Sequence, residues 1–286
     1  MPNTGHGKVS ERLLRQVAQI GDTDIGMVTR ASAELTGVDA GFRSQYVGFN
    51  DGHWHSAVLV NPSGRNDDHL ISDGIGRPTK LAELLPTAMR IVDDVADRVG
   101  MSVCWARLAL MDAGARVWEH RDFLELKEQD KVRLHVPMIT NSKAMLHFED
   151  AAVHMAKGHV WHLATDVPHG ASNDGPARVH LIIDCDGTPG FLDRVTVRTL
   201  DPSLVSPFPV LDEYAIEGIE TEFRDRLVSG DLAGAERLVL SLFGSWNLDG
   251  RTTYGILARF FENLGDWQKA AHWRTEERDK LYERVS

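Results

Sequence analysis

The sequence predicts a mainly β protein, an antiparallel barrel or jelly roll with added helices, and three observations indicate this. From about residue 102 the chain runs as short apolar segments separated by turns, a pattern typical of antiparallel barrels and jelly rolls. The connections between these segments are too short for the crossover helices that a parallel sheet requires. Beyond the prolines at 202, 207 and 209 the apolar spacing becomes helical and stays so towards the end of the chain.

Helices and a pair of strands are predicted before the β core. One amphipathic helix covers residues 10–19, with Ser10 as its N-cap. Residues 45–60 are predicted to form two strands around an Asn-Asp-Gly turn. A second helix is predicted over residues 86–99, because its apolar residues recur at helical spacing and Gly100 follows as a stop.

The core and the tail divide the chain into two predicted parts. The core strands are predicted at 103–111, 132–139, 144–148, 159–163 and 178–184. The tail helices are predicted at 212–229, 231–246, 251–264 and 266–284. We therefore predict a jelly-roll core over residues 1–205 and a helical region over residues 206–286. Because so few helical hairpins cannot stand alone, we expect them to pack on the core or on a second copy of the chain, as a homodimer.

Composition excludes some classes of partner. The net charge of −11 and the lack of a long basic run argue against nucleic-acid binding. No stretch approaches 18 apolar residues and the first residues lack a signal-peptide core, so we expect no membrane association and a cytoplasmic location. Cys104 and Cys185 lie in apolar runs without a CxxC partner, and we expect two reduced, buried thiols.

A histidine and an aspartate two residues apart mark a candidate metal site. In an extended strand His120 and Asp122 would project from the same face. A third ligand must come from elsewhere, and His169, after Val167-Pro168, is the best candidate. Two histidines and one carboxylate form the facial triad of non-haem Fe(II) oxygenases, which leaves coordination positions open.

Two arginines lie among aliphatic residues downstream of this pair. Arg133 precedes Leu134-His135, and Arg178 begins a similar run after His169. An inward-facing arginine in a strand needs an anion, because an unpaired buried charge is costly. A dicarboxylate cosubstrate would supply one through a bidentate contact. Alternatively, these arginines face solvent or pair with acidic residues, of which the candidates are Glu149 and Asp184.

The ordered motifs resemble the aspartyl/asparaginyl β-hydroxylase-like family, and within it the bacterial L-proline cis-3- and cis-4-hydroxylases. The motifs are His120-Arg-Asp122-Phe-x-Glu125-Leu, Arg133-x-His135, Gly158-x-Val-Trp161, Pro168-His169 and Arg178-x-x-Leu-Ile-Ile-Asp184. The resemblance extends over most of the chain. It implies a double-stranded β-helix dioxygenase that uses Fe(II), 2-oxoglutarate and O2. Such an enzyme hydroxylates an unactivated C–H bond and forms succinate and CO2.

The resemblance also implies roles for individual residues. The iron ligands would be His120, Asp122 and His169, and the presence of Asp122 favours hydroxylation over halogenation. Arg178 would bind the distal carboxylate of 2-oxoglutarate. The residues expected near the cosubstrate are Arg133 and His135, and those expected near the substrate are Arg107, Arg121 and Trp161.

Departures from the proline enzymes bear on the substrate. Lys127 stands where they carry an aspartate, and His162-Leu-Ala-Thr replaces a Phe-Leu-Asp-Ala stretch. We expect a free L-amino acid, proline-like or another building block of a specialised metabolite. One alternative is the same chemistry on a peptide, protein or carrier-bound residue. A non-catalytic jelly-roll binding protein or a zinc hydrolase is a further alternative, but neither requires Arg178.

Overall fold

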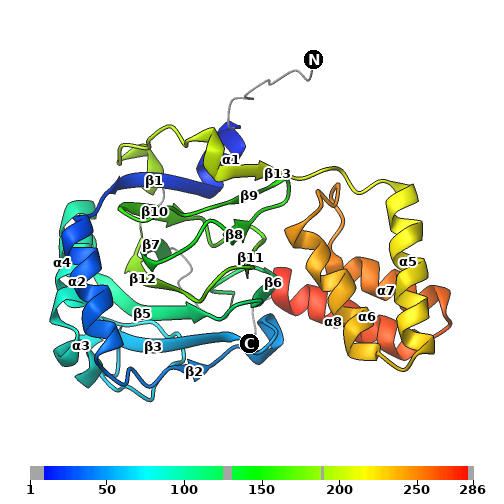
Figure 1. Ribbon diagram of the computed structural model, residues 1–286, viewed down its shortest axis with the longest axis horizontal. Helices are drawn as coiled ribbons and strands as arrows, with labels where there is room; N and C mark the ends of the chain where they lie inside the picture. Colours follow the sequence, from blue (N-terminus) through cyan, green and yellow to red (C-terminus); the bar gives the residue numbers. More distant parts are fainter. Residues whose placement is uncertain (1–9, 125–130, 188–189, 283–286) are drawn as a thin grey trace.

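A computed structural model describes residues 10–124, 131–187 and 190–282, in which two antiparallel sheets pack face to face (Figure 1). The larger sheet has the strand order β1-β10-β7-β12-β5-β3-β2, with β4 beside β3. Its strands are β1 (Val17–Asp22), β2 (Arg43–Ser44), β3 (Trp54–Asn61), β4 (Arg77–Pro78), β5 (Val103–Met111), β7 (Lys131–Ile139), β10 (His159–Leu163) and β12 (Arg178–Asp186).

The smaller sheet has the order β13-β9-β8-β11-β6. Its strands are β6 (Arg116–His120), β8 (Ala144–His147), β9 (Ala151–Val153), β11 (His169–Asn173) and β13 (Val205–Pro207). Every pairing between these named strands is antiparallel. The predicted jelly-roll core is therefore confirmed.

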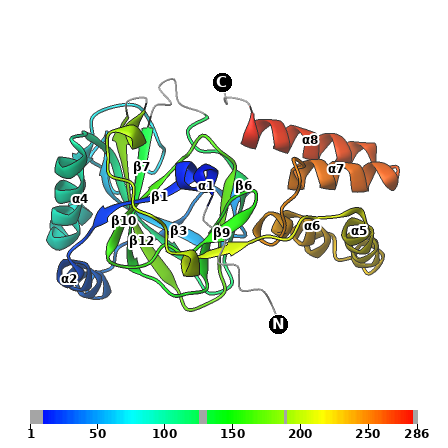
Figure 2. The same cartoon turned by 90° about the horizontal axis from the view of Figure 1, so that it is seen from above.

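Helices cover the outer face of the larger sheet (Figures 1 and 2). They are α2 (Ile25–Thr36), α3 (Lys80–Leu84) and α4 (Pro86–Val99), whereas the short α1 (Glu11–Gln16) leads into β1. Leu134 and Val136 of β7 belong to the apolar cluster beneath these helices. Successive side chains of a strand point to opposite faces, so Arg133 and His135 face the space between the two sheets. The same alternation directs Arg107 of β5 and Arg178 of β12 inward.

The helical region packs on the edge of the smaller sheet. It consists of α5 (Glu213–Val228), α6 (Leu232–Leu240), α7 (Thr253–Asn263) and α8 (Trp267–Leu281). These helices share an apolar cluster of their own, to which the core contributes Trp118 of β6. Figure 2 shows the four helices on one side of the sandwich, with α8 and α7 above α6 and α5. The predicted boundary between residues 205 and 206 falls within β13.

Several local predictions are confirmed and others are wrong. Helix α4 has the predicted bounds, and Gly100 follows it with φ +66°, a conformation that favours glycine. The helix predicted over residues 10–19 ends at Gln16, because Val17 begins to pair with β10. Helix α2 was not predicted. Both cysteines are free and buried, as expected. No helix in the described residues has the length and apolar character needed to cross a membrane.

Candidate metal centre

A β-bulge shapes the strand that carries the first candidate ligand. His120 of β6 pairs with His169 of β11, but Val117 pairs with Ala171. Two residues of β6, Trp118 and Glu119, therefore lie opposite the single Gly170. Such a bulge re-aims side chains. Here it lets Val117 and His120, three positions apart, both line the same cavity between the sheets.

Gly170 makes this bulge possible, because a side chain there would meet backbone. A Cβ atom would lie 2.8 Å from the carbonyl oxygen of Val117 and 3.4 Å from that of Trp118. We expect Gly170→Ala to lower the free energy of unfolding by about 1–3 kcal/mol, measured by chemical denaturation. The matched control is Gly218→Ala in α5, where nothing lies within 4 Å of the added atom. If Gly170→Ala lowers the free energy of unfolding no more than Gly218→Ala does, this role for Gly170 is wrong.

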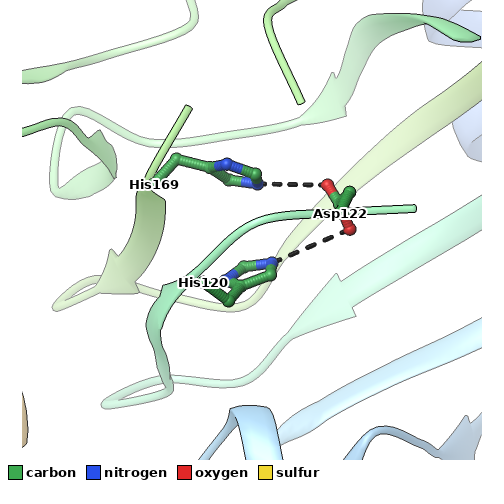
Figure 3. A group of neighbouring side chains, drawn as sticks. All are labelled: His120, Asp122 and His169. Atoms are coloured by element: carbon green, nitrogen blue, oxygen red, sulfur yellow. Dashed lines mark hydrogen bonds and ion pairs between the residues drawn. The ribbon is translucent and has the colours of Figure 1, made fainter. Parts of the chain in front are cut away.

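The three predicted ligands converge (Figure 3), and all three line the cavity between the sheets. Nδ1 of His120 lies 2.8 Å from the carbonyl oxygen of Trp118, and Nδ1 of His169 lies 2.9 Å from that of Val167. A carbonyl only accepts hydrogen bonds, so each Nδ1 carries a proton. In the neutral form of each imidazole the Nε2 atom would offer its lone pair to a metal. These two Nε2 atoms face the carboxylate of Asp122, at 3.8 Å for His120 and 3.1 Å for His169.

This donor set fits a divalent cation. In the part of the chain that the structure describes, His120, Asp122 and His169 form the one group of potential ligands whose atoms all lie within 4.8 Å of one another. Burial lowers the pKa of His120 to about 4, so this imidazole is neutral at physiological pH. The Nε2 lone pair of His120 and the carboxylate of Asp122 face each other with no hydrogen-bond donor between them. A cation bound between these two groups would relieve their repulsion.

Asp122 lies just beyond the strand rather than in it. Strand β6 ends at His120, so the prediction of one continuous extended segment is wrong. The backbone N–H of Asp122 instead donates to the carbonyl of Thr165 at 3.0 Å. Phe123 follows with φ +62°, a left-handed conformation that is costly for a bulky residue and concentrates at functional sites. This turn brings the carboxylate back towards the two imidazoles.

Arg133 forms an ion pair with Asp122. Its Nη1 donates to Oδ2 of Asp122, and its Nε and Nη2 donate to Asp184 at 2.7 and 3.1 Å. Burial alone would raise the pKa of Asp122, but Arg133 and the two histidines outweigh it and keep that pKa well below its usual range. The sequence predicts a cosubstrate contact for Arg133, whereas the structure gives its guanidinium two carboxylate partners. The alternative of a pair with Asp184 is the one observed.

Arg178 differs from Arg133 in having no acidic partner among the described residues. Its side chain is 8% exposed, it lines the cavity, and its Nη2 lies 2.7 Å from the sulfur of Met111. Burial lowers the pKa of this guanidinium to about 10. His135 lies in the same cavity with an unpartnered Nε2, and burial together with Arg133 and Arg178 holds its pKa well below the usual range. The lining of the cavity therefore includes a cation and a neutral imidazole.

Arg107 adds a second under-partnered cation to the cavity. It is 4% exposed, and its Nε and Nη1 have no hydrogen-bond partner. Its Nη2 is 3.9 Å from Asp184, and its guanidinium lies over the rings of Tyr46 and Trp54 at 5.9 and 5.8 Å. Aromatic faces stabilise a cation only in part, so Arg107 retains donors for an anion.

The remaining predicted substrate residues have different outcomes. Arg121 lines the cavity, with its guanidinium 5.8 Å from the ring centre of Tyr282 at the end of α8. Trp161 is fully buried in the apolar core, where its indole N–H donates to the carbonyl of Ala156. It does not line the cavity, so its prediction as a substrate contact is wrong. Glu125 and Lys127 lie outside the described residues.

An apolar part of the cavity lining was not predicted from the sequence. Aromatic and aliphatic residues contribute to the lining of the cavity, whose volume is about 340 Å³. They include Tyr46, Phe49, Trp54, Leu70 and Ile71. The available signal was a cluster of aromatic residues just before and after the predicted Asn-Asp-Gly turn. His162, one of the departures from the proline enzymes, is not part of the cavity.

The fold and the site together define a class of protein. Two histidines and a carboxylate inside a jelly roll are the ligand set of non-haem iron oxygenases. Residues 29–187 match the family model described as aspartyl/asparaginyl beta-hydroxylase. This chain belongs to that family, and it is accordingly an oxidoreductase.

Two relatives are similar to this chain over most of its length. The L-proline cis-4-hydroxylase of Rhizobium meliloti (strain 1021) is 28% identical over 233 residues, which cover 79% of this chain and 82% of the relative. The L-proline cis-3-hydroxylase 2 of a Streptomyces species is 31% identical over 235 residues, which cover 78% of this chain and 79% of the relative.

Proposed function

We propose that this protein hydroxylates an unactivated C–H bond of a free L-amino acid, proline or a proline-like one, with Fe(II), 2-oxoglutarate and O2. Per turnover, one oxygen atom of O2 enters the amino acid as a hydroxyl group. The other enters 2-oxoglutarate, which leaves as succinate and CO2. The names of the two proline hydroxylases support this substrate class.

The main support for this proposal is that Arg178 is buried without a carboxylate partner among the described residues. This buried cation lines the same cavity as the metal ligands. An unpaired buried charge is costly, so its retention favours an anion that arrives from solution. A dicarboxylate with one end on a metal and the other on Arg178 satisfies both groups. Neither a zinc hydrolase nor a non-catalytic jelly roll needs this arginine.

The protein's own residues bind and orient the reactants. His120, Asp122 and His169 would hold Fe(II), which supplies oxygen activation when bound. Arg133 keeps Asp122 ionised and directed towards the two imidazoles. Arg178 and the neutral His135 would hold the far carboxylate of 2-oxoglutarate. Apolar side chains, among them Phe49 and Leu146, line the cavity and would lie beside the reacting C–H bond.

The shape of the cavity favours a free amino acid over a tethered one. Its volume of about 340 Å³ suits a small molecule beside the cosubstrate, and four arginines line it. Two donors of Arg107 have no partner, and among the described residues Arg178 donates to the sulfur of Met111 rather than to a carboxylate. One carboxylate from the cosubstrate and one from the substrate would satisfy both, whereas an internal residue of a peptide has no free α-carboxylate.

Arg107 is therefore expected to bind the substrate carboxylate. We predict that Arg107→Met will raise the KM for the amino acid about 10- to 100-fold, because a charge-assisted hydrogen bond contributes about 1.5–3 kcal/mol. The KM for 2-oxoglutarate should stay within about two-fold of the wild-type value. Steady-state kinetics with each reactant varied in turn makes this measurement. A rise confined to 2-oxoglutarate would exchange the roles of Arg107 and Arg178.

A screen of free amino acids tests the proposed function. Purified protein is incubated with Fe(II), ascorbate, 2-oxoglutarate and one L-amino acid at a time, and product mass is read for one added oxygen. We expect a gain for proline or another small, cyclic amino acid, matched by an equal amount of succinate. If no free amino acid gains oxygen while the same residue in a peptide or on a carrier does, the free-substrate proposal is wrong.

A further inference from the structure

The helical region contacts the metal-binding strand on both sides of His120. Glu119 and Arg121 flank this ligand, and α7 or α8 bonds to each of them. The helical region has its own apolar cluster, in which Trp118 fills the place next to the strand. Apolar packing could therefore dock the helices without the polar contacts that follow.

The side chain of Glu119 binds the start of α7. One carboxylate oxygen accepts from the backbone N–H of Thr253 at 2.9 Å and from its hydroxyl at 3.0 Å. An acidic group at a helix N-terminus is stabilised by the free N–H groups there. Glu119 is 2% exposed. Burying a carboxylate costs desolvation free energy, so apolar packing alone would dock the helix at lower cost.

The backbone on both sides of His120 is held as well. The hydroxyl of Tyr254 in α7 donates to the carbonyl of Glu119 at 2.6 Å, and its ring stacks on Trp273 of α8. On the other side, the backbone N–H of Arg121 donates to the carbonyl of Lys280 at 3.0 Å. Peptide groups before and after the ligand are thus fixed by two helices that contribute no ligand.

A third contact reaches the imidazole itself. The ammonium of Lys280 lies 4.1 Å from the ring centre of Phe49, and the ring of Phe49 packs edge-on against His120 at 5.6 Å. Lys280 is held in turn by Glu276, one helical turn earlier, at 3.0 Å. The last turn of α8 therefore contacts the ring of His120 indirectly, through Phe49.

We propose that the C-terminal helices act as a positioning device for the metal centre, with Glu119 and Tyr254 as positioning residues. The bulge sends Trp118 and Glu119 outwards to the helices and His120 inwards to the metal. Through their hydrogen bonds to residues 119 and 121, α7 and α8 fix the direction of the Nε2 lone pair of His120. This inference rests on the proposed function, since it takes His120 as a metal ligand.

Metal affinity in the absence of cosubstrate and substrate tests the device without a measurement of activity. The dissociation constant for Co(II) is measured on the full chain by competition with a chelator. Tyr254→Phe keeps the stacked ring and removes only the hydroxyl, and we expect binding to weaken several-fold. Glu119→Ala should weaken it about 10- to 100-fold, the range for residues that orient metal ligands. Glu119→Gln keeps one acceptor oxygen and should restore part of the loss.

A core substitution in the same helices separates positioning from general stability. Phe223 of α5 packs on Phe260 and Phe261, so Phe223→Leu should lower Tm and leave the Co(II) dissociation constant unchanged. The inference is overturned if Tyr254→Phe binds Co(II) like the wild type, or if Phe223→Leu weakens binding equally. Should Glu119→Ala fail to fold, Tyr254→Phe decides alone. If His120→Ala binds Co(II) as the wild type does, the metal centre itself is wrong.

Discussion

Replacing Asp122 by alanine is expected to abolish 2-oxoglutarate-dependent succinate formation and to weaken metal binding at least about 100-fold. Loss of a residue that merely orients a ligand costs about 10- to 100-fold, so loss of the one carboxylate ligand should cost at least as much. The fold should survive, because Arg133 keeps two hydrogen bonds to Asp184 in the variant. Succinate release and the Co(II) dissociation constant are the two measurements.

The control for this substitution is Asp166→Ala, which removes an exposed carboxylate three residues before His169. Its activity and metal affinity should equal those of the wild type. Thermal unfolding of both variants reports on the fold. Full activity of Asp122→Ala would mean that the carboxylate is not a metal ligand.

The second large effect is expected at Arg178. We predict that Arg178→Met will raise the KM for 2-oxoglutarate about 100-fold, because it removes a charge-assisted, bidentate contact of about 3 kcal/mol. Without ligands the variant should be as stable as the wild type or more stable. Burial lowers the pKa of Arg178, so its charged form costs folding free energy at every pH below about 10. Kinetics with 2-oxoglutarate and urea denaturation of the ligand-free protein measure the two effects.

Arg133→Met is the matched control, since this arginine is buried in the same cavity but paired. Its loss leaves Asp184 buried without its main partner, and breaking such a pair costs about 3–5 kcal/mol. We therefore expect opposite stability effects from two arginine-to-methionine changes in one cavity. A strong destabilisation by Arg178→Met would show that Arg178 has a structural role.

The sequence predicted the metal ligands better than it predicted their geometry. His120, Asp122 and His169 were found by motif order and residue type, and the structure brings them together. The prediction that one extended strand carries both His120 and Asp122 is wrong, because β6 ends at His120. The turn at Phe123, with its positive φ, takes the place of the strand. Such a turn depends on tertiary contacts that no local pattern reveals.

The strands that were predicted are those with apolar runs long enough to show their period. Strand β5 has the predicted bounds, and β7 and β12 differ from theirs by only a few residues. Strand β11 was missed because its small and polar residues, Gly170 to Asn173, carry no β preference. It forms because β6 and β8 pair with it from both sides.

The part of the site that could not be predicted involves partners distant in sequence. Arg133 and Asp184 are 51 residues apart, and Glu119 and Thr253 are 134 apart. Glu119 gave no signal in the sequence, since a single acidic residue beside a histidine is common. Helix α2 could have been found, because Asp24 is a suitable N-cap and Val28, Ala31 and Leu35 follow at helical spacing.

The most direct measurement is a crystal structure of the protein loaded without oxygen with a divalent metal and 2-oxoglutarate. We expect one anomalous peak, bound by Nε2 of His120, Nε2 of His169 and the carboxylate of Asp122. The far carboxylate of 2-oxoglutarate should lie on Arg178, with Arg107 left free for the substrate. A metal held by other residues, or a cosubstrate carboxylate on Arg107 with Arg178 unoccupied, would contradict the proposed site.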